Sequence, residues 1–261
     1  FLALSAVAVY AVAAKIAEYT YLLNKQFSNA LMPLVSQSKG AGDTEIVRRI
    51  LVDGTRFLLA VAVPFIALLF FYADAILIRW MGQEFAEAAP LLRILLLAVL
   101  FSSVQLNAAN VLGMTGEHRF VAFAMGGSAI LNLILSIVLI QVFGLSGVAL
   151  GTLLATLVAE FWLVLPRACR KQGLGVADFL RHAIWPTIPA LIPALGAAAL
   201  MAYAQPPDNF GWIIHQGGIA ALRYYATFYR TGLSGWEREL VVEKARSIFN
   251  RSRATHLPPT E

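Results

Sequence analysis

The chain has 261 residues, of which 59% are hydrophobic and 13% are charged, and its net charge is +5. Soluble globular domains carry about 25% charged residues, so this composition leaves too few charges for the surface of a soluble enzyme. The single cysteine, Cys169, rules out a disulfide within the chain, and no cluster of Cys, His and carboxylates has metal-ligand spacing. Long continuous apolar runs, without the alternation of barrel strands, predict an all-α integral membrane protein.

Seven segments are long enough to cross a bilayer core, which takes about 20 helical residues. We therefore predict a bundle of about seven transmembrane helices over residues 1–229, followed at 230–261 by a cytoplasmic amphipathic segment and a disordered tail. Because residue 1 is Phe and lies directly in an apolar run, we expect the chain to be the C-terminal part of a longer protein. The predicted spans lie near residues 2–35, 57–78, 91–112, 121–142, 146–165, 183–204 and 211–229.

The Lys and Arg residues of the predicted connections are distributed very unevenly. Fifteen lie in the connections at 37–56, 113–120 and 166–182 and in the tail from 230, against two, Arg79 and Arg93, on the other side. Cytoplasmic connections are rich in Lys and Arg, so the chain should begin outside the cytoplasm and end inside it. The basic balance thus reflects membrane topology, and no basic patch with interleaved aromatic residues indicates nucleic-acid binding.

Four polar residues of the first span, Lys15, Glu18, Lys25 and Asn29, lie within an arc of about 80° on a helix. An ionisable residue at membrane depth costs about 2.5–3.5 kcal/mol, so such residues should face water or a partner. This polar stripe continues over about four turns, which favours a helix that lines a wet cavity. In the alternative interpretation, Lys15 and Glu18 pair with each other and Lys25 reaches the cytoplasmic interface.

Three residues of later spans are further cavity candidates: Arg93, Asn107 and Asn132. Arg93 and Asn107 share a polar face of the third span with Ser103 and Asn110. Asn132 lies on one face of the fourth span, at i, i+4 and i+8 with two serines. An interfacial position for Arg93, and interhelical hydrogen bonds for the two asparagines, are consistent with the same patterns.

Three other patterns concern packing and surroundings. The connection at 39–56 is expected to form a short amphipathic helix on the inner leaflet, capped by Asp43. Glu160, near the cytoplasmic end of the fifth span, is expected to be solvated through the lipid headgroups. The four-residue repeat of small side chains in that span predicts close approach to a neighbouring helix. Its members are Gly147, Gly151, Ala155 and Ala159.

Short motifs occur in a fixed order over residues 5–165. They are VYAVAAK at 9–15, ALMPLVS at 30–36, GAGD at 40–43, RWMGQEF at 79–85, LGMTG at 112–116 and FGLSGVALGT at 143–152. Together they resemble the polysaccharide-export flippases, the Wzx-like family of the multidrug/oligosaccharidyl-lipid/polysaccharide (MOP) superfamily. The resemblance implies a two-bundle transporter with a central cavity, of which this chain would be the second half.

The same resemblance implies a function and its residues. It implies alternating-access movement of an undecaprenyl-pyrophosphate-linked oligosaccharide across the bacterial cytoplasmic (inner) membrane, for O-antigen or exopolysaccharide biosynthesis. Lys15, Lys25 and Arg93 would be cavity cations for the pyrophosphate, and Glu18 could couple proton or sodium movement. No cofactor is implied. The implied partners are membrane lipids, the missing N-terminal half, and a polysaccharide polymerase with glycosyltransferases.

Other functions remain open at this point. A lipid II flippase would share the chemistry of the substrate, whereas a cation-coupled multidrug (MATE-like) antiporter should favour a carboxylate-based site. A membrane sugar polymerase or ligase is disfavoured by the short connections and by the absence of a nucleophile or an acid–base pair in the sequence. A non-transporting scaffold would require the polar stripe to be fully paired and dry.

Overall fold

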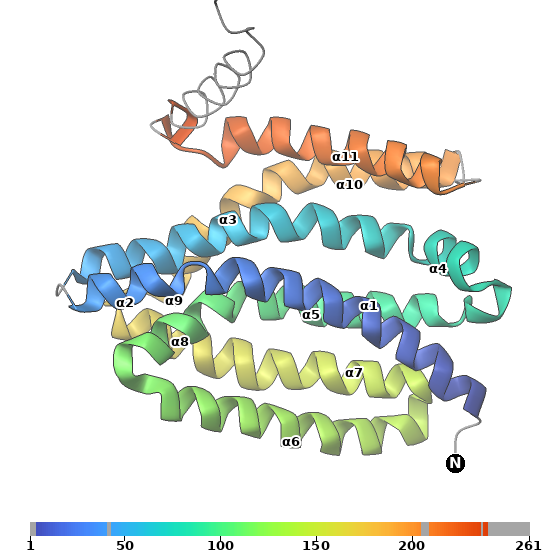
Figure 1. Ribbon diagram of the computed structural model, residues 1–261, viewed down its shortest axis with the longest axis horizontal. Helices are drawn as coiled ribbons and strands as arrows, with labels where there is room; N and C mark the ends of the chain where they lie inside the picture. The colour runs from blue at the N-terminus through green and yellow to red at the C-terminus, as the bar shows by residue number, and fades with distance from the viewer. Residues whose placement is uncertain (1–3, 41–42, 205–208, 236, 240–261) are drawn as a thin grey trace, which may run out of the picture.

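The computed structural model describes residues 4–40, 43–204, 209–235 and 237–239. Over these residues the protein consists of helices and short turns, without a strand, which confirms the predicted all-α class. Figure 1 shows the long helices lying alongside one another, with the turns gathered at the two ends of the bundle. The predicted segment at 230–261 lies mostly outside the described residues.

The first third of the chain forms two long helices, each followed by a shorter one. The elements are α1 (Leu4–Asn29), α2 (Met32–Gly40), α3 (Thr44–Phe71), α4 (Ala73–Met81) and the short 3-10 helix η1 (Gln83–Phe85). Asp43 caps α3 as predicted, because its carboxylate accepts a hydrogen bond from the Ile46 N–H at 3.0 Å.

The prediction of a separate amphipathic helix at 39–56 is wrong. α2 ends at Gly40, and α3 continues without a break through Arg56, because Val47 and Leu51 near its start are buried in the core rather than laid on a lipid surface. With 28 residues, α3 is about 42 Å long. This length exceeds the thickness of an apolar bilayer core, which is about 30 Å.

The middle of the chain forms a helical hairpin beside a central helix. Its elements are α5 (Ala88–Leu112), the π-helical turn η2 (Gly113–Glu117), α6 (His118–Phe143), α7 (Leu145–Ala155), the π-helical segment η3 (Thr156–Val164) and α8 (Leu165–Lys171). The chain reverses between α5 and α6 at Gly116, whose φ of +93° favours glycine. Gly144, with φ +58°, ends α6 in the same way.

The small-residue repeat of α7 lies against α6, as predicted. A Cβ atom on Gly147 would lie 2.2 Å from the carbonyl oxygen of Leu139, and one on Gly151 would lie 2.8 Å from the backbone nitrogen of Ser136. Neither position could carry a larger side chain without separating the two backbones.

The last part of the chain forms a bent helix and its partner. It comprises α9 (Val176–Phe179), η4 (Leu180–Ile184), η5 (Trp185–Thr187), α10 (Ile188–Ala204) and α11 (Phe210–Thr231). The break at η5 coincides with Pro186, which cannot donate a backbone hydrogen bond. α10 and α11 pack against each other and against α3 on one side of the bundle, whereas α6 and α7 lie on the other side (Figure 1).

Five helical stretches of the described chain are long and apolar enough to span a membrane. One of them, Ala88–Phe143, has 56 residues and contains two helices, α5 and α6, because of the reversal at η2. The five stretches overlap six of the seven predicted spans. α11 coincides with the seventh, at 211–229, but is not among the five. The seven membrane crossings and their bounds remain predictions. The five are Ala6–Gly40, Thr44–Phe71, Ala88–Phe143, Leu145–Lys171 and Val176–Met201.

α5 is the central helix and fixes the position of α1. Most of its residues are buried, and it packs against α1, α3 and α7. One apolar cluster surrounds its first half and includes Leu77 and Leu92, and another surrounds its second half and includes Leu112 and Leu165. Because α5 and α3 cover only part of the surface of α1, the rest of that helix stays exposed.

Candidate functional site

The polar stripe lies on an open face of α1. Lys15 donates a hydrogen bond to Glu18 Oε2 at 2.8 Å, yet the two side chains remain 57% and 52% exposed. Lys25 is exposed and Asn29 is half-buried. The Lys15–Glu18 ion pair that the alternative interpretation predicts is therefore present, but it is not packed against another described helix. The structure brings the four predicted α1 residues onto one face that, within a membrane-spanning helix, requires water or a partner.

The opposite face of α1 carries uncharged polar residues that are buried against α5. Asn24 Nδ2 donates to Ser103 Oγ at 2.9 Å, and one turn later Ser28 donates to Asn107 Oδ1. Both pairs are separated by 79 positions in the sequence, so α1 and α5 run parallel in a fixed register. We call Asn24, Ser28, Ser103 and Asn107 the buried polar ladder.

Asn107, a predicted cavity residue, belongs to this ladder and not to the open face. It is 2% exposed, accepts a hydrogen bond from Ser28 and donates to Thr55 Oγ1 of α3 at 3.4 Å. Asn110 Nδ2 connects the ladder to the polar stripe, because it donates to Ser28 Oγ at 2.9 Å and to Asn29 Oδ1 at 3.4 Å. Asn107 thus joins three helices, which matches the interhelical alternative.

Asn132 also makes an interhelical contact. Its Oδ1 accepts hydrogen bonds from Ser136 at 3.0 Å and from Thr152 of α7 at 3.3 Å. These contacts tie α6 to α7. The structure does not bring Asn132 to the polar stripe, because helical periodicity identifies a polar face without showing which neighbour that face meets.

Arg93 lies near the start of α5, at the end of the bundle where α4 lies. Its guanidinium pairs with Asp74 of α4, and its Nε donates to the carbonyl oxygen of Phe70 at 3.1 Å. The side chain therefore links α5 to the break between α3 and α4. A part for Arg93 in a cavity remains a prediction.

An apolar groove of about 490 Å³ lies between α1, α3 and α11. α1 contributes Leu23 and Phe27 to its wall, and α11 contributes Tyr225. Leu23 is 61% exposed and follows Lys15 and Tyr19 around the helix at four-residue spacing, so the groove borders the open face. The surface of α1 therefore presents charged groups beside an apolar recess.

The sequence pattern did not reveal the partners of Glu160. This carboxylate is half-buried in η3 and accepts hydrogen bonds from two α5 side chains, Ser102 at 3.1 Å and Gln105 at 2.8 Å. It is thus held between helices and not by lipid headgroups alone. Ser102 and Gln105 lie three residues apart on α5, a spacing that places two side chains on one helix face, but the sequence does not show which helix they meet.

Comparisons with known proteins agree with this architecture. The MatE family model matches residues 2–138. The chain is 27% identical over 155 residues to the probable low-salt glycan biosynthesis flippase Agl15 of Haloferax volcanii, an alignment that covers 59% of this chain and 33% of Agl15. The solved lipid II flippase MurJ, in an inward closed conformation, matches with a TM-score of 0.66 at 19% identity, over 86% of this chain and 47% of MurJ.

The chain spans a third of the length of Agl15 and about half of that of MurJ. At 19% identity, the likeness to MurJ establishes a common fold. Together with the apolar helical stretches, these matches identify a multi-pass membrane protein.

Proposed function

Because the chain belongs to the MatE family of the MOP superfamily, we propose that it forms the second helical bundle of a flippase for lipid-linked oligosaccharides. The proposed substrate is an undecaprenyl-pyrophosphate-linked oligosaccharide, moved from the inner to the outer leaflet of a bacterial cytoplasmic membrane for O-antigen or exopolysaccharide synthesis. The C-terminus then lies in the cytoplasm, and a polymerase and glycosyltransferases act beside the flippase.

The observation that carries this proposal is the polar stripe on the open face of α1. It holds two ammonium groups, Lys15 and Lys25, against one carboxylate, Glu18. A surface with net positive charge suits a pyrophosphate, and the exposed side chains leave their donors available to a ligand. In the intact protein this face would line the cavity between the two bundles.

The apolar groove suits the other part of the proposed substrate, its hydrocarbon chain. A lipid-linked oligosaccharide has a charged head beside a long hydrocarbon chain, and each buried CH₂ of such a chain contributes about 0.8 kcal/mol. The groove between α1, α3 and α11 places aliphatic and aromatic walls next to the polar stripe. One surface of this bundle could therefore receive both parts of an amphiphile.

Transport on this proposal requires no covalent chemistry. The substrate changes sides because the cavity opens alternately toward each leaflet, and the buried polar ladder keeps α1 fixed to α5 while the bundle moves. Protonation of Glu18, or a sodium ion bound to it, would release Lys15 from its 2.8 Å contact. This exchange is our proposed coupling step.

Two lysines on the open face argue against a site for cationic drugs, because like charges repel there. A lipid II flippase shares the anionic pyrophosphate head, so a transport assay has to compare the two lipids directly. With the intact two-bundle protein reconstituted into vesicles, we expect faster movement of an undecaprenyl-pyrophosphate oligosaccharide than of lipid II. The reverse preference would assign the protein to the alternative function.

Export in cells tests the polar stripe itself. In a strain that depends on this protein, Lys15→Ala and Lys25→Ala should each reduce surface polysaccharide by at least about tenfold, because about 1.4 kcal/mol of charge-assisted binding is lost. Immunoblotting of the membrane fraction should show unchanged protein levels. Arg119→Ala is the matched control, because Arg119 is exposed on α6, away from the stripe. Normal export in both lysine variants would refute the cavity assignment.

A further inference from the structure

A second polar recess lies where α2, α3, η2 and α8 meet, at the end of the bundle that holds the Lys- and Arg-rich connections. It has a volume of about 190 Å³. Two lysines from different elements border it, Lys39 of α2 and Lys171 of α8, together with Thr44, the first residue of α3. None of these residues belongs to the polar stripe or to the apolar groove.

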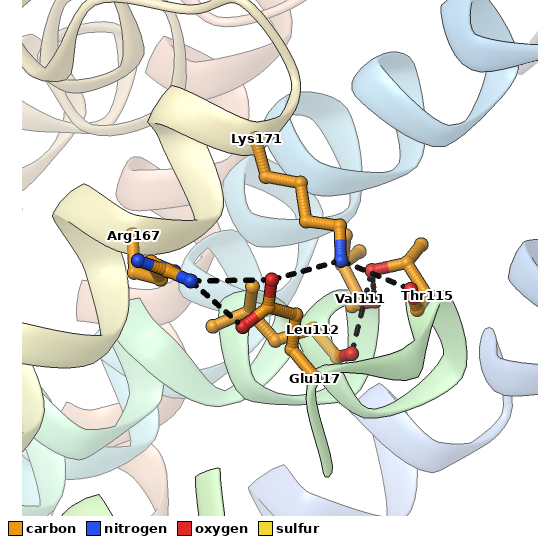
Figure 2. Close-up of polar contacts among 6 residues, drawn as sticks. All are labelled: Val111, Leu112, Thr115, Glu117, Arg167 and Lys171. Atoms are coloured by element: carbon orange, nitrogen blue, oxygen red, sulfur yellow. Dashed lines mark hydrogen bonds and ion pairs between the residues drawn. The ribbon is translucent and has the colours of Figure 1, made fainter. Parts of the chain in front are cut away.

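Lys171 is held in place by the neighbouring turn. Figure 2 shows its Nζ donating to the carbonyl oxygen of Thr115 at 3.0 Å and to Glu117 Oε1 at 3.2 Å. Arg167 approaches the same carboxylate at 3.1 Å. The hydrogen bond from Lys171, and next that from Arg167, lower the pKa of Glu117 below its usual value. Glu117 is thus ionised at neutral pH and balances one of two cations.

Lys39 makes fewer polar contacts than Lys171 in the described part of the chain. It lies at the end of α2, is exposed, and donates no hydrogen bond and forms no ion pair within the described part of the chain. Its Nζ lies 3.7 Å from where a Cβ atom on Gly116 would be, so the ammonium group sits against the η2 turn. The carboxylate of Asp43 is already used as the cap of α3. Lys39 therefore has donors free for a ligand.

The position of the recess indicates which ligand it meets. It lies at the ends of membrane-spanning helices, where phospholipid headgroups lie. The anionic lipids of a cytoplasmic leaflet attract each nearby Lys or Arg with about 1 kcal/mol. Asp43 also borders the recess, and its carboxylate accepts a hydrogen bond from the Ile46 N–H at the start of α3.

We propose that this recess binds the phosphate of an anionic phospholipid headgroup, with Lys39 and Lys171 as its two cationic contacts. Lys171 is the preorganised contact, and Lys39 closes on the phosphate from α2. The bound lipid joins α2, α3 and α8, three elements that come together at this end of the bundle. The site is separate from the proposed transport path, so it binds a lipid that remains in its leaflet.

The test uses the purified protein in nanodiscs of phosphatidylcholine with increasing fractions of phosphatidylglycerol. We expect phosphatidylglycerol to raise the unfolding temperature of the wild type in a saturable manner. Lys39→Gln should shift the midpoint of that titration about fivefold toward higher lipid fraction, since about 1 kcal/mol per lysine corresponds to this factor. Lys39→Arg should restore the wild-type midpoint. Because Lys39 has no described polar contact, these variants should fold normally.

Two controls identify the ligand and the site. Arg170→Gln removes an exposed cation of the same connection that does not border the recess, so its midpoint should equal that of the wild type. In detergent without anionic lipid, inorganic phosphate should not raise the unfolding temperature. Stabilisation by phosphate alone would overturn the lipid assignment in favour of a soluble anion. An unchanged midpoint in Lys39→Gln, or an equal shift in Arg170→Gln, would overturn the site.

Discussion

The two polar faces of α1 lie on one helix of 26 residues but have different surroundings. The polar stripe is charged, and its ion pair, Lys15 with Glu18, is exposed and local. The buried polar ladder is uncharged, and each of its two α1 side chains, Asn24 and Ser28, has a partner on α5. The difference follows from the cost of desolvation. A buried amide or hydroxyl is compensated by a hydrogen bond, whereas a buried charge needs an oppositely charged partner as well as hydrogen bonds.

This comparison separates two roles that the sequence pattern alone combines. The ladder fixes the position of α1, and therefore its loss should lower stability. The stripe does little to hold the fold, because an exposed ion pair contributes about 0–1 kcal/mol. A residue of the stripe should therefore affect transport without affecting folding, and a residue of the ladder should affect folding first.

The largest expected effect on stability comes from Asn107→Leu. The substitution removes the hydrogen bonds to Ser28 and Thr55 and leaves a buried hydroxyl with one partner fewer, which should cost about 1–3 kcal/mol. The free energy of unfolding, measured by titration with a denaturing detergent, checks this value. Asn29→Leu, the same substitution at a half-buried stripe residue whose side chain has only a long 3.4 Å contact with Asn110, should cost less than about 1 kcal/mol. Equal losses of unfolding free energy in the two variants would contradict the difference in stabilising role between the ladder and the stripe.

A smaller effect is expected from the double variant Lys15→Ala/Glu18→Ala. Because both side chains are more than half exposed, the free energy of unfolding should change by less than about 0.5 kcal/mol. Thermal unfolding in detergent measures the effect of this double substitution on stability, and the export assay measures its effect on transport. A loss of stability as large as that of Asn107→Leu would mean that the stripe is packed in the intact protein.

The smallest effect concerns Glu117, a charged residue that is half-buried and, unlike Glu18 of the stripe, paired with two cations. Its lowered pKa means that it contributes stability above its unfolded pKa of about 4.3, and that this contribution is lost as pH falls through the lower folded value. Glu117→Gln should therefore lower the unfolding temperature slightly at neutral pH and have no effect in strong acid. A difference that grows on acidification would contradict this assignment.

Much of the fold could be predicted because membrane-spanning helices can be identified from the length and hydropathy of apolar segments. Six of the seven predicted spans overlap apolar helical stretches, and the close packing of α7 followed from Gly147 and Gly151. The connection at 39–56 was misassigned because its amphipathic pattern fits equally a surface helix and the buried start of a longer one. Val47 and Leu51 meet the core, so the helix continues into the span.

The candidate site was predicted in part. Lys15, Glu18, Lys25 and Asn29 share one face, as the periodicity of their helix required. The same periodicity placed Asn107 on a polar face but could not tell an open face from one that meets another helix. Glu117 was not predicted at all, because Arg167 and Lys171, which pair with it, lie about 50 residues further along the chain.

By itself, the sequence determined that this protein is an all-helical membrane protein with a charged stripe on its first helix, because hydropathy and helical periodicity are properties of neighbouring residues. The tertiary structure alone decided which polar face is buried, which residues bind Glu160, and that Lys39 and Lys171 border one recess. These depend on contacts between residues far apart in the chain. Such contacts form only when the helices pack, and packing decides which polar groups remain available to a ligand.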